Sequence, residues 1–229
     1  DASHAIGAKY LDEPIGNCEF SDVTVFSFHP VKIITTAEGG LATTNSSKLF
    51  KKLELYRSHG VTRNQELMHS NSPGSWYYEQ IDLGFNYRMT EIQAALGISQ
   101  MKRLDEFVNK RHILKDRYDS LLEDLPIVIP SQNDFSHSSM HLYPILVDLK
   151  LAAKSRSQIF EELRNLEIGV NIHYIPIHLH PYYQKFGFQA GDFPKAENYY
   201  SQAISLPLFS SMSIEQQDQV INTLRKTLL

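Results

Sequence analysis

The chain has 229 residues, of which 42% are hydrophobic and 21% are charged, and its formal net charge is −4. This composition is typical of a soluble globular protein with one large domain or two small ones. The sequence lacks a long basic run and any apolar stretch near the roughly 18 residues of a membrane span, which argues against nucleic acid and membranes as partners. The single cysteine, Cys18, excludes an intrachain disulfide and favours a reducing, cytoplasmic compartment.

The first hundred residues alternate between strand and helix patterns. Residues 1–4, DASH, carry neither an initiator methionine nor a signal-peptide pattern, so we expect the chain to begin inside a domain. Further on, β-branched and aromatic residues predict a buried strand at 23–28 and a short strand at 41–44, and apolar spacing predicts a helix at 48–57. A polar segment at 64–76 is typical of a loop.

A long helix is predicted to open at Thr90 and to run towards Leu122. Thr90 and Gln93 fit a capping box, in which each side chain bonds the other's backbone N–H group. Gly97 is the only interruption of the helical pattern, and the second half is charged enough to be solvated on most sides. A helix of this length often bridges two domains.

The C-terminal part alternates again and predicts a small separate domain. Strands are expected at 127–129, 141–147 and 169–174, and helices at 155–166, 195–203 and 214–228; capping boxes at Ser155/Gln158 and Ser213/Gln216 open the first and last of these helices. The chain is therefore of the α/β or α+β class, with one domain at 1–125 and a smaller one at 126–229.

One lysine stands out as a candidate for covalent chemistry. Lys32 follows the predicted strand at 23–28, in the segment TVFSFHPVKIITTAEGG, where His29 is the only other basic side chain. Apolar surroundings weaken the hydration of an ammonium group, so the pKa of the lysine falls and the neutral amine becomes accessible. Such an amine can form a Schiff base with a carbonyl compound, including pyridoxal phosphate (PLP). The alternative is an ordinary surface lysine after a strand.

Two further residues in this region suit PLP. The cofactor requires an amine and also a carboxylate that keeps its pyridine nitrogen protonated, and Asp1 can supply the carboxylate. Ser27 lies at the end of the predicted strand, where a hydroxyl can donate to a phosphate oxygen. The plainer alternatives are a terminal surface aspartate and a strand serine bonded to backbone.

Two other clusters are candidate ligand-binding segments. Asn86, Tyr87 and Arg88 precede the capped helix, a position that suits an anionic ligand, although Arg88 can also pair with a surface carboxylate. His173, His178 and His180 have a spacing that zinc can use. The prolines and aromatic residues between them instead favour a rigid pocket wall or a surface loop, and we expect no metal.

Taken together, these segments resemble a known enzyme family. DASHAIGA, FSFHPVKIITTAEGG, RSHGV, LGFNYRMTEIQAALGISQ, NIHYIPIHLHPYY and ISLPLF occur in the order found in nucleotide-sugar aminotransferases of the DegT–StrS type. The resemblance extends over the whole chain. FHPVK, HYIPIHLHPYY and FGF look most like the pseudaminic-acid branch, the transaminases of UDP-4-amino-4,6-dideoxy-N-acetyl-β-L-altrosamine.

The resemblance implies a fold-type-I, PLP-dependent homodimer, of which this chain is the end of the α/β/α large domain plus the small α+β C-terminal domain. Family members also carry an upstream portion, with a Gly/Thr/Ser loop that cradles the cofactor phosphate. The resemblance also assigns roles. Lys32 is the Schiff-base lysine and proton shuttle. The other residues assigned to the cofactor are Asp1 at the pyridine nitrogen, His4 near the ring, Ser27 at the phosphate, and Asn86 at the phosphate across the dimer interface, with Tyr87 and Arg88 beside it. The residues assigned to the sugar-nucleotide pocket are Asn171, His173 and Tyr174.

The implied reaction transfers an amino group from L-glutamate to C4 of a UDP-linked 4-keto-6-deoxy-N-acetylhexosamine, for pseudaminic acid and surface glycan synthesis. A dehydratase branch of the family has histidine in place of the lysine, so Lys32 argues against dehydration. Another nucleotide keto-sugar remains an alternative substrate. The other alternative is not an enzyme: the chain would be a dimerisation or scaffold fragment without catalytic chemistry.

Overall fold

The computed structural model describes residues 1–229 and divides into two compact units. The N-terminal unit comprises Asp1–Asp105 and Phe135–Ser139, and the C-terminal unit comprises Glu106–Asp134 and Met140–Leu229. The division falls at Asp105, whereas the sequence analysis placed a domain boundary after residue 125. Residues 106–125 belong with the C-terminal unit because their apolar side chains contribute to its core.

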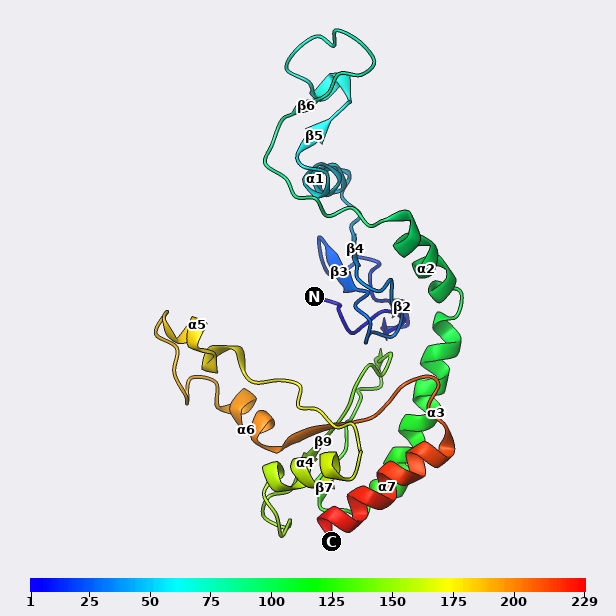
Figure 1. Ribbon diagram of the computed structural model, residues 1–229, viewed down its shortest axis with the longest axis vertical. Helices are drawn as coiled ribbons and strands as arrows, with labels where there is room; N and C mark the ends of the chain where they lie inside the picture. Colours follow the sequence, from blue (N-terminus) through cyan, green and yellow to red (C-terminus); the bar gives the residue numbers. More distant parts are fainter. The chain divides into compact units, whose positions relative to one another are not determined.

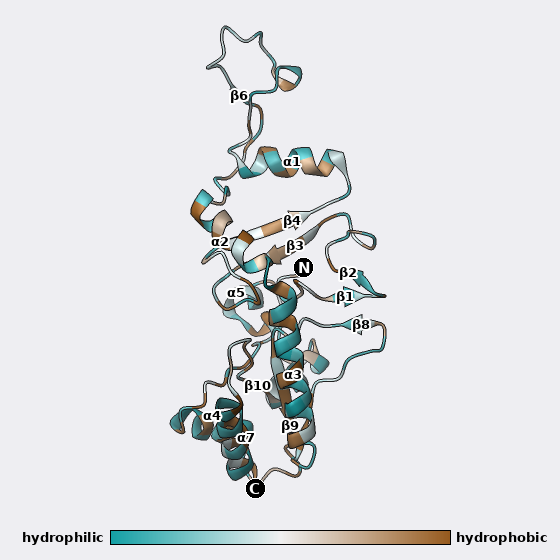
Figure 2. Ribbon diagram, turned by 90° about the vertical axis from the view of Figure 1, so that its right-hand side faces the viewer, coloured by the Kyte–Doolittle hydropathy of each residue, from teal (hydrophilic) through white to brown (hydrophobic).

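The N-terminal unit is built from short antiparallel sheets and two helices (Figure 2). One sheet has the strand order β2-β1-β8, and two further sheets pair β3 with β4 and β5 with β6. The elements are β1 (Lys9–Tyr10), β2 (Glu13–Pro14), β3 (Thr24–Ser27), β4 (Gly40–Thr43), α1 (Ser47–Arg57), β5 (Val61–Thr62), the 3₁₀ helix η1 (Gln65–Leu67), β6 (Glu79–Gln80), α2 (Glu91–Met101) and β8 (Ser136–His137).

Strand β3 is buried on one face only. Phe26 and Phe28 are buried at 3% and 7% exposure, whereas Val25, which precedes Phe26, is 49% exposed. Side chains alternate between the two faces of a strand, so the Phe residues point to the interior and Val25 points away from it. The predicted strand at 23–28 is present as Thr24–Ser27, and the prediction that it is buried holds for one face only.

The predicted helix from Thr90 to Leu122 is two helices, α2 and α3 (Leu104–Leu122). The predicted capping box is present: Thr90 Oγ1 accepts from the Gln93 N–H, and Gln93 Oε1 accepts from the Thr90 N–H. The interruption lies at Lys102 and Arg103, where the Arg103 N–H donates to the Gln100 carbonyl in a tight turn that ends α2. Gly97 does not break the helix. It faces the N-terminal core, where an added Cβ would stand 2.8 Å from Thr36 Cγ2.

The C-terminal unit packs helices against an antiparallel sheet of order β10-β9-β7. Figure 1 shows α7 lying along α3, and Gln217 Nε2 ties the two helices by donating to the Leu114 carbonyl at 2.7 Å. The remaining elements are β7 (Ile127–Val128), β9 (Tyr143–Val147), α4 (Arg156–Asn165), the 3₁₀ helix η2 (Ile177–Leu179), α5 (Pro181–Gln184), α6 (Pro194–Gln202), β10 (Ala203–Leu206) and α7 (Ile214–Leu228).

The core of this unit follows from the alternation of β9 and β10 with the apolar faces of the helices. Tyr143, Ile145 and Val147 are fully buried on one face of β9. The capping boxes predicted at Ser155/Gln158 and Ser213/Gln216 are confirmed and open α4 and α7. None of the helices is long and apolar enough to cross a membrane.

The strand expected at 169–174 does not form. Asn171 makes an isolated bridge to Ser205 on β10, and the chain leaves the sheet after it. The Asn171 side chain accepts the N–H of Ile172 at 2.8 Å, which gives that backbone donor a local partner in place of a neighbouring strand. The segment therefore lies beside β10 without continuing the sheet.

Candidate active site

Lys32 lies in a loop that starts at the end of β3. The Lys32 N–H donates to the His29 carbonyl at 2.9 Å, which forms a turn, and the next two residues, Ile33 and Ile34, are buried at 5% and 1% exposure. The loop closes on the Phe28 carbonyl, which accepts from both the Thr36 N–H and the Thr35 hydroxyl at 3.0 Å. The backbone under the lysine is thus fixed at both ends.

Burial lowers the pKa of the Lys32 ammonium below its usual value. The side chain is half-buried, with the buried pair Ile33–Ile34 next to it in the chain. The apolar segment around Lys32 predicts this direction of shift. A lower pKa increases the fraction of neutral amine, the form that attacks a carbonyl carbon and accepts a proton.

Asp1 and Ser27 both lie at β3, the strand that leads into the lysine loop. The Ala2 N–H donates to the Val25 carbonyl at 2.8 Å, which places Asp1 beside β3, and Asp1 Oδ1 accepts from the Ser3 N–H at 2.8 Å. Ser27 ends β3, and its Oγ lies 3.4 Å from the His29 backbone nitrogen. A carboxylate, a hydroxyl and an amine are therefore all attached to one strand and the loop that follows it.

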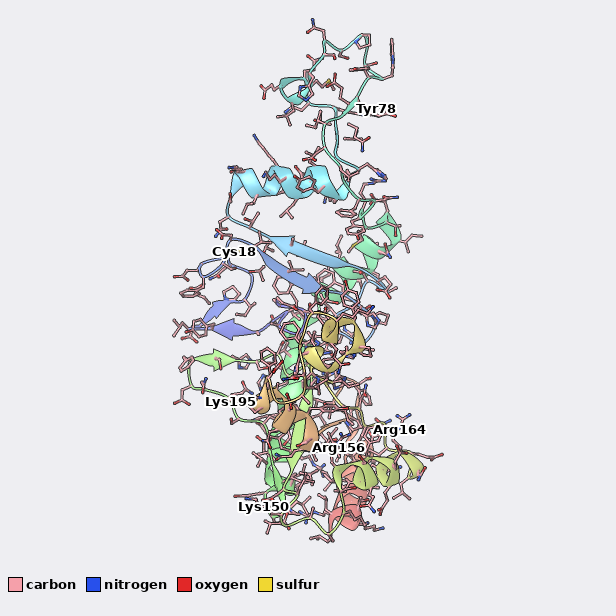
Figure 3. All side chains as sticks on the ribbon, turned by 90° about the vertical axis from the view of Figure 1, so that its left-hand side faces the viewer. Cys18, Tyr78, Lys150, Arg156, Arg164 and Lys195 are labelled. Carbon is pink, nitrogen blue, oxygen red and sulfur yellow. The ribbon has the colours of Figure 1, made fainter.

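The remaining predicted cofactor residue in this region, His4, contributes its carbonyl to a hydrogen bond from Ser139 Oγ at 3.1 Å. A pocket of about 200 Å³ opens beside Asp1 and is otherwise lined by Ala2 and by residues between Ile15 and Thr24. One of these lining residues is Cys18, which is labelled in Figure 3. Neither Ser27 nor Lys32 lines this pocket, so the pocket does not bring Asp1 together with either residue.

Asn86, Tyr87 and Arg88 project from a segment held against the end of α1. The backbone of this segment is fixed by hydrogen bonds from the Phe85 N–H to the Tyr56 carbonyl and from the Tyr87 N–H to the Arg57 carbonyl, at 2.7 and 2.9 Å. All three predicted site residues are exposed, and the Tyr87 ring stacks on Phe85 at 4.8 Å. The structure shows no contact between them and the Lys32 loop.

Two glycines hold this segment in place. A Cβ on Gly60 would lie 1.8 Å from the Asp82 carbonyl oxygen, and a Cβ on Gly84 would lie 2.2 Å from the Gly60 nitrogen. Gly60 also has a positive φ of 71°, which disfavours other residues. The RSHGV and LGFNYR motifs therefore lie backbone against backbone.

The third predicted group lies in the C-terminal unit beside β10. His173 Nδ1 is 2.8 Å from Ser205 Oγ, and Asn171 Nδ2 is 3.4 Å from His173 Nε2. The Tyr174 ring stands edge-on to the His173 imidazole at 4.6 Å and is 60% exposed. The structure thus brings Asn171, His173 and Tyr174 together as one surface.

His178 has a different role from the one its spacing with His173 and His180 suggested. It is buried at 6% exposure, and its Nε2 bonds Glu197 Oε1 at 2.7 Å. The structure contains no group of three or more His, Cys, Asp or Glu side chains arranged to hold a metal ion. Glu197 also accepts from the N–H groups of Gly191 and Phe193, so it joins η2, the 191–193 turn and α6.

Acid is expected to release the Gly191–Phe193 turn. The hydrogen bonds to Glu197, first that of His178 and then that of the Gly191 N–H, hold the pKa of its carboxyl below the usual range. A carboxyl whose pKa is lower in the folded state adds stability above the ordinary value of about 4.3 and loses this contribution as the pH falls through the lower folded pKa. Amide exchange at Gly191 and Phe193, corrected for intrinsic rates, should show protection at pH 7 and its loss below about pH 4.

Glu197→Gln should lower this protection already at neutral pH, whereas Glu161→Gln on exposed α4 surface should leave it unchanged. Equal protection of the two amides at pH 3 and pH 7 would contradict the role of the carboxylate.

Three features of these sites were not predicted from the sequence. Ser205 and Glu197 contact their partners over 32 and 19 residues, and the Gly60–Gly84 contact joins two separate motifs. The glycines were visible inside the quoted motifs, but the sequence does not show that they face each other. Ser205 lies in the quoted ISLPLF segment, where it is an ordinary polar residue within a strand pattern.

Comparison with known proteins identifies the family to which the chain is similar. The model of the DegT/DnrJ/EryC1/StrS aminotransferase family matches residues 1–225. The chain is 40% identical over 228 residues to the spore coat polysaccharide biosynthesis protein SpsC of Bacillus subtilis, covering 98% of this chain and 58% of SpsC. It is 36% identical over 225 residues to the UDP-4-amino-4,6-dideoxy-N-acetyl-beta-L-altrosamine transaminase of Campylobacter jejuni, covering 98% and 56%.

Among solved structures, the PLP form of the putative sugar aminotransferase Spr1654 from Streptococcus pneumoniae superposes with a TM-score of 0.88 at 33% identity, covering 99% of this chain and 56% of that chain. This similarity confirms the predicted fold class. The chain spans a little over half the length of the proteins it matches.

Proposed function

Since the chain belongs to the DegT/DnrJ/EryC1/StrS aminotransferase family, we propose that it carries the catalytic lysine of a PLP-dependent aminotransferase that acts on a nucleotide-linked keto-sugar. The observation that carries the proposal is the position of Lys32 on the loop after β3, with Asp1 and Ser27 attached to the same strand. The PLP form of Spr1654 supports the choice of cofactor.

The residues around β3 fit PLP by their chemistry. The cofactor presents an aldehyde, a pyridine nitrogen and a phosphate, and the strand offers an amine, a carboxylate and a hydroxyl. In the proposed site Lys32 would hold the aldehyde carbon, Asp1 would keep the pyridine nitrogen protonated, Ser27 would donate to the phosphate, and His4 would lie near the ring. Bound PLP supplies an electron sink for the negative charge that forms when Cα of the amino donor loses its proton.

The protein's own contribution to each step is proton transfer and orientation. Once the amino donor has displaced it, Lys32 Nζ would accept the Cα proton as a general base and then donate it, as a general acid, to the cofactor carbon C4′. The burial that lowers its pKa increases the fraction of neutral amine that can act as the base. Asn86 is proposed to reach the phosphate site of a second subunit in a homodimer, with Tyr87 and Arg88 beside it. The exposure of all three side chains supports this arrangement.

For substrates, we propose L-glutamate as amino donor and a UDP-linked 4-keto-6-deoxy-N-acetylhexosamine as acceptor, giving a UDP-4-amino sugar for pseudaminic acid or another surface glycan. The similarity to the Campylobacter jejuni transaminase supports this acceptor. The higher identity to SpsC keeps another nucleotide keto-sugar as the second candidate. Asn171, His173 and Tyr174 are proposed to line the sugar pocket, since the structure gathers them on one surface.

The test is a pair of half-reactions, performed on the 229-residue chain and on the protein that carries it. With PLP and L-glutamate, 2-oxoglutarate should form in one equivalent without any sugar. Addition of the UDP-4-keto sugar should then yield the 4-amino sugar, with ping-pong kinetics. Failure of the first half-reaction in both samples would contradict aminotransfer. Activity of the longer protein alone would identify this chain as a part that cannot act without the remainder.

A further inference from the structure

We propose that Ser205 is a positioning residue whose hydroxyl holds the His173 imidazole in a single tautomer and orientation, and thereby sets the affinity for the sugar substrate. The second half of this proposal rests on the proposed function, because it requires His173 to contact the sugar. The first half concerns the C-terminal unit alone and stands on its contacts.

Ser205 is well suited to hold a neighbouring segment. It is 5% exposed and lies in β10, every residue of which is buried, so its position is fixed by the core. Its backbone pairs with Asn171 in both directions, donating at 2.8 Å and accepting at 3.2 Å. Its side chain then reaches His173 Nδ1 at 2.8 Å. One core residue therefore fixes both the backbone and the imidazole of the predicted sugar-pocket wall.

The contacts at the two ring nitrogens favour one tautomer. Asn171 Oδ1 accepts the Ile172 N–H at 2.8 Å, which orients the amide so that its NH₂ group is the one that faces His173. An NH₂ group is only a donor, so His173 Nε2 acts as the acceptor in this 3.4 Å contact. The ring proton of the neutral imidazole is therefore on Nδ1, which donates it to Ser205 Oγ at 2.8 Å. This short bond is the stronger of the two and holds the tautomer, because the 3.4 Å contact at Nε2 is too long for a strong hydrogen bond.

The consequence is a defined chemical face towards a ligand. With its proton on Nδ1, the imidazole presents the Nε2 lone pair, which recognises a hydroxyl or an amide N–H group and not a carbonyl oxygen. The contact from Asn171 to Nε2 is long, so a ligand donor can replace it. A keto-sugar with hydroxyl and N-acetyl groups offers such donors.

The experiment combines NMR and kinetics on Ser205→Ala, with Ser205→Thr as the conservative variant and Ser201→Ala as the matched control. The exposed Ser201 hydroxyl bonds the Asn198 carbonyl within α6 and does not contact His173. Imidazole ¹⁵N shifts of His173 are recorded well above pH 6.5, where histidine is ordinarily neutral. Both half-reactions are measured with PLP, L-glutamate and the UDP-4-keto sugar in the protein that carries this chain.

Ser205→Ala should move the His173 proton from Nδ1 towards Nε2 and raise KM for the sugar about fivefold, the factor expected from one neutral hydrogen bond. The rate of the glutamate half-reaction should stay unchanged, Ser205→Thr should restore both properties, and Ser201→Ala should alter neither. An unchanged tautomer in Ser205→Ala would overturn the inference, and a shifted tautomer with an unchanged sugar KM would overturn its substrate part. Lack of the glutamate half-reaction in the unsubstituted protein would contradict the proposed function instead, and the NMR result would still decide the role of Ser205.

Discussion

Lys32→Ala is expected to reduce amino transfer by at least about a thousandfold while leaving the fold intact. Proton transfer by a positioned group contributes about 10²–10⁴ in rate, and the substitution also removes the only proposed covalent attachment of the cofactor. The fold should persist because the loop is held by the Phe28 carbonyl and the buried Ile33–Ile34 pair, and not by the lysine side chain. The measurements are 2-oxoglutarate release and, after borohydride reduction with PLP, the mass of the peptide that contains Lys32.

Two variants control this experiment. Lys52→Ala removes a lysine from the exposed surface of α1 and should leave both measurements unchanged. Lys32→Arg keeps a positive charge but provides no amine that attacks an aldehyde, so it should behave like Lys32→Ala. Normal turnover in either Lys32 variant, or a reduced adduct on another lysine of the unsubstituted protein, would contradict the assignment.

Gly60→Ala is expected to destabilise the contact between α1 and the segment that carries Asn86 by about 2–4 kcal/mol, the sum of left-handed backbone strain and overpacking. The new Cβ would stand 1.8 Å from the Asp82 carbonyl oxygen, and backbone cannot give way as a flexible side chain does. The Ile81 and Asp82 amides both donate to the Gly60 carbonyl, at 2.9 and 3.3 Å, so their hydrogen exchange reports the loss directly.

Control substitutions at two other glycines separate the effect of backbone strain from that of the steric clash. Gly187 has a positive φ of 94° and open space around it, so Gly187→Ala adds strain without a clash. Gly169 has open space and no positive φ, so Gly169→Ala adds neither. Protection of the Ile81 and Asp82 amides should be lost in Gly60→Ala and retained in both controls. Retained protection in Gly60→Ala would show that Asp82 moves aside at little cost.

Local signals predicted the helix starts well. The capping boxes at Thr90, Ser155 and Ser213 involve residues three apart, so their hydrogen bonds could be inferred from the sequence and are present in the structure. The break at Lys102–Arg103 could not be inferred in this way, because neither residue is a helix breaker.

The same holds for the candidate site, where local features were predicted from the sequence and contacts between distant residues were not. The apolar segment around Lys32 predicted a desolvated amine, and the direction of its pKa shift agrees. The expected strand at 169–174 failed because the Asn171 side chain bonds its neighbour's N–H and the chain then leaves the sheet. The partners of His173 and His178 lie far away in sequence, and a single sequence does not show which distant residues meet. The assigned roles of Asp1, His4, Ser27, Asn86, Tyr87 and Arg88 remain predictions.

The closure of the lysine loop on a single carbonyl has a practical consequence for engineering. The pairing of β3 with β4 ends at Ser27 and Gly40, and the Phe28 carbonyl then receives Thr35 and Thr36. Residues 29–34 are therefore anchored at both ends by the strand and the threonine pair, and between these ends by the buried side chains of Ile33 and Ile34. We expect a segment of equal length from another family member to fit between Phe28 and Thr35 without shifting the strand register if it keeps apolar residues at positions 33 and 34, so that residues 29–31 can be varied to tune the amine.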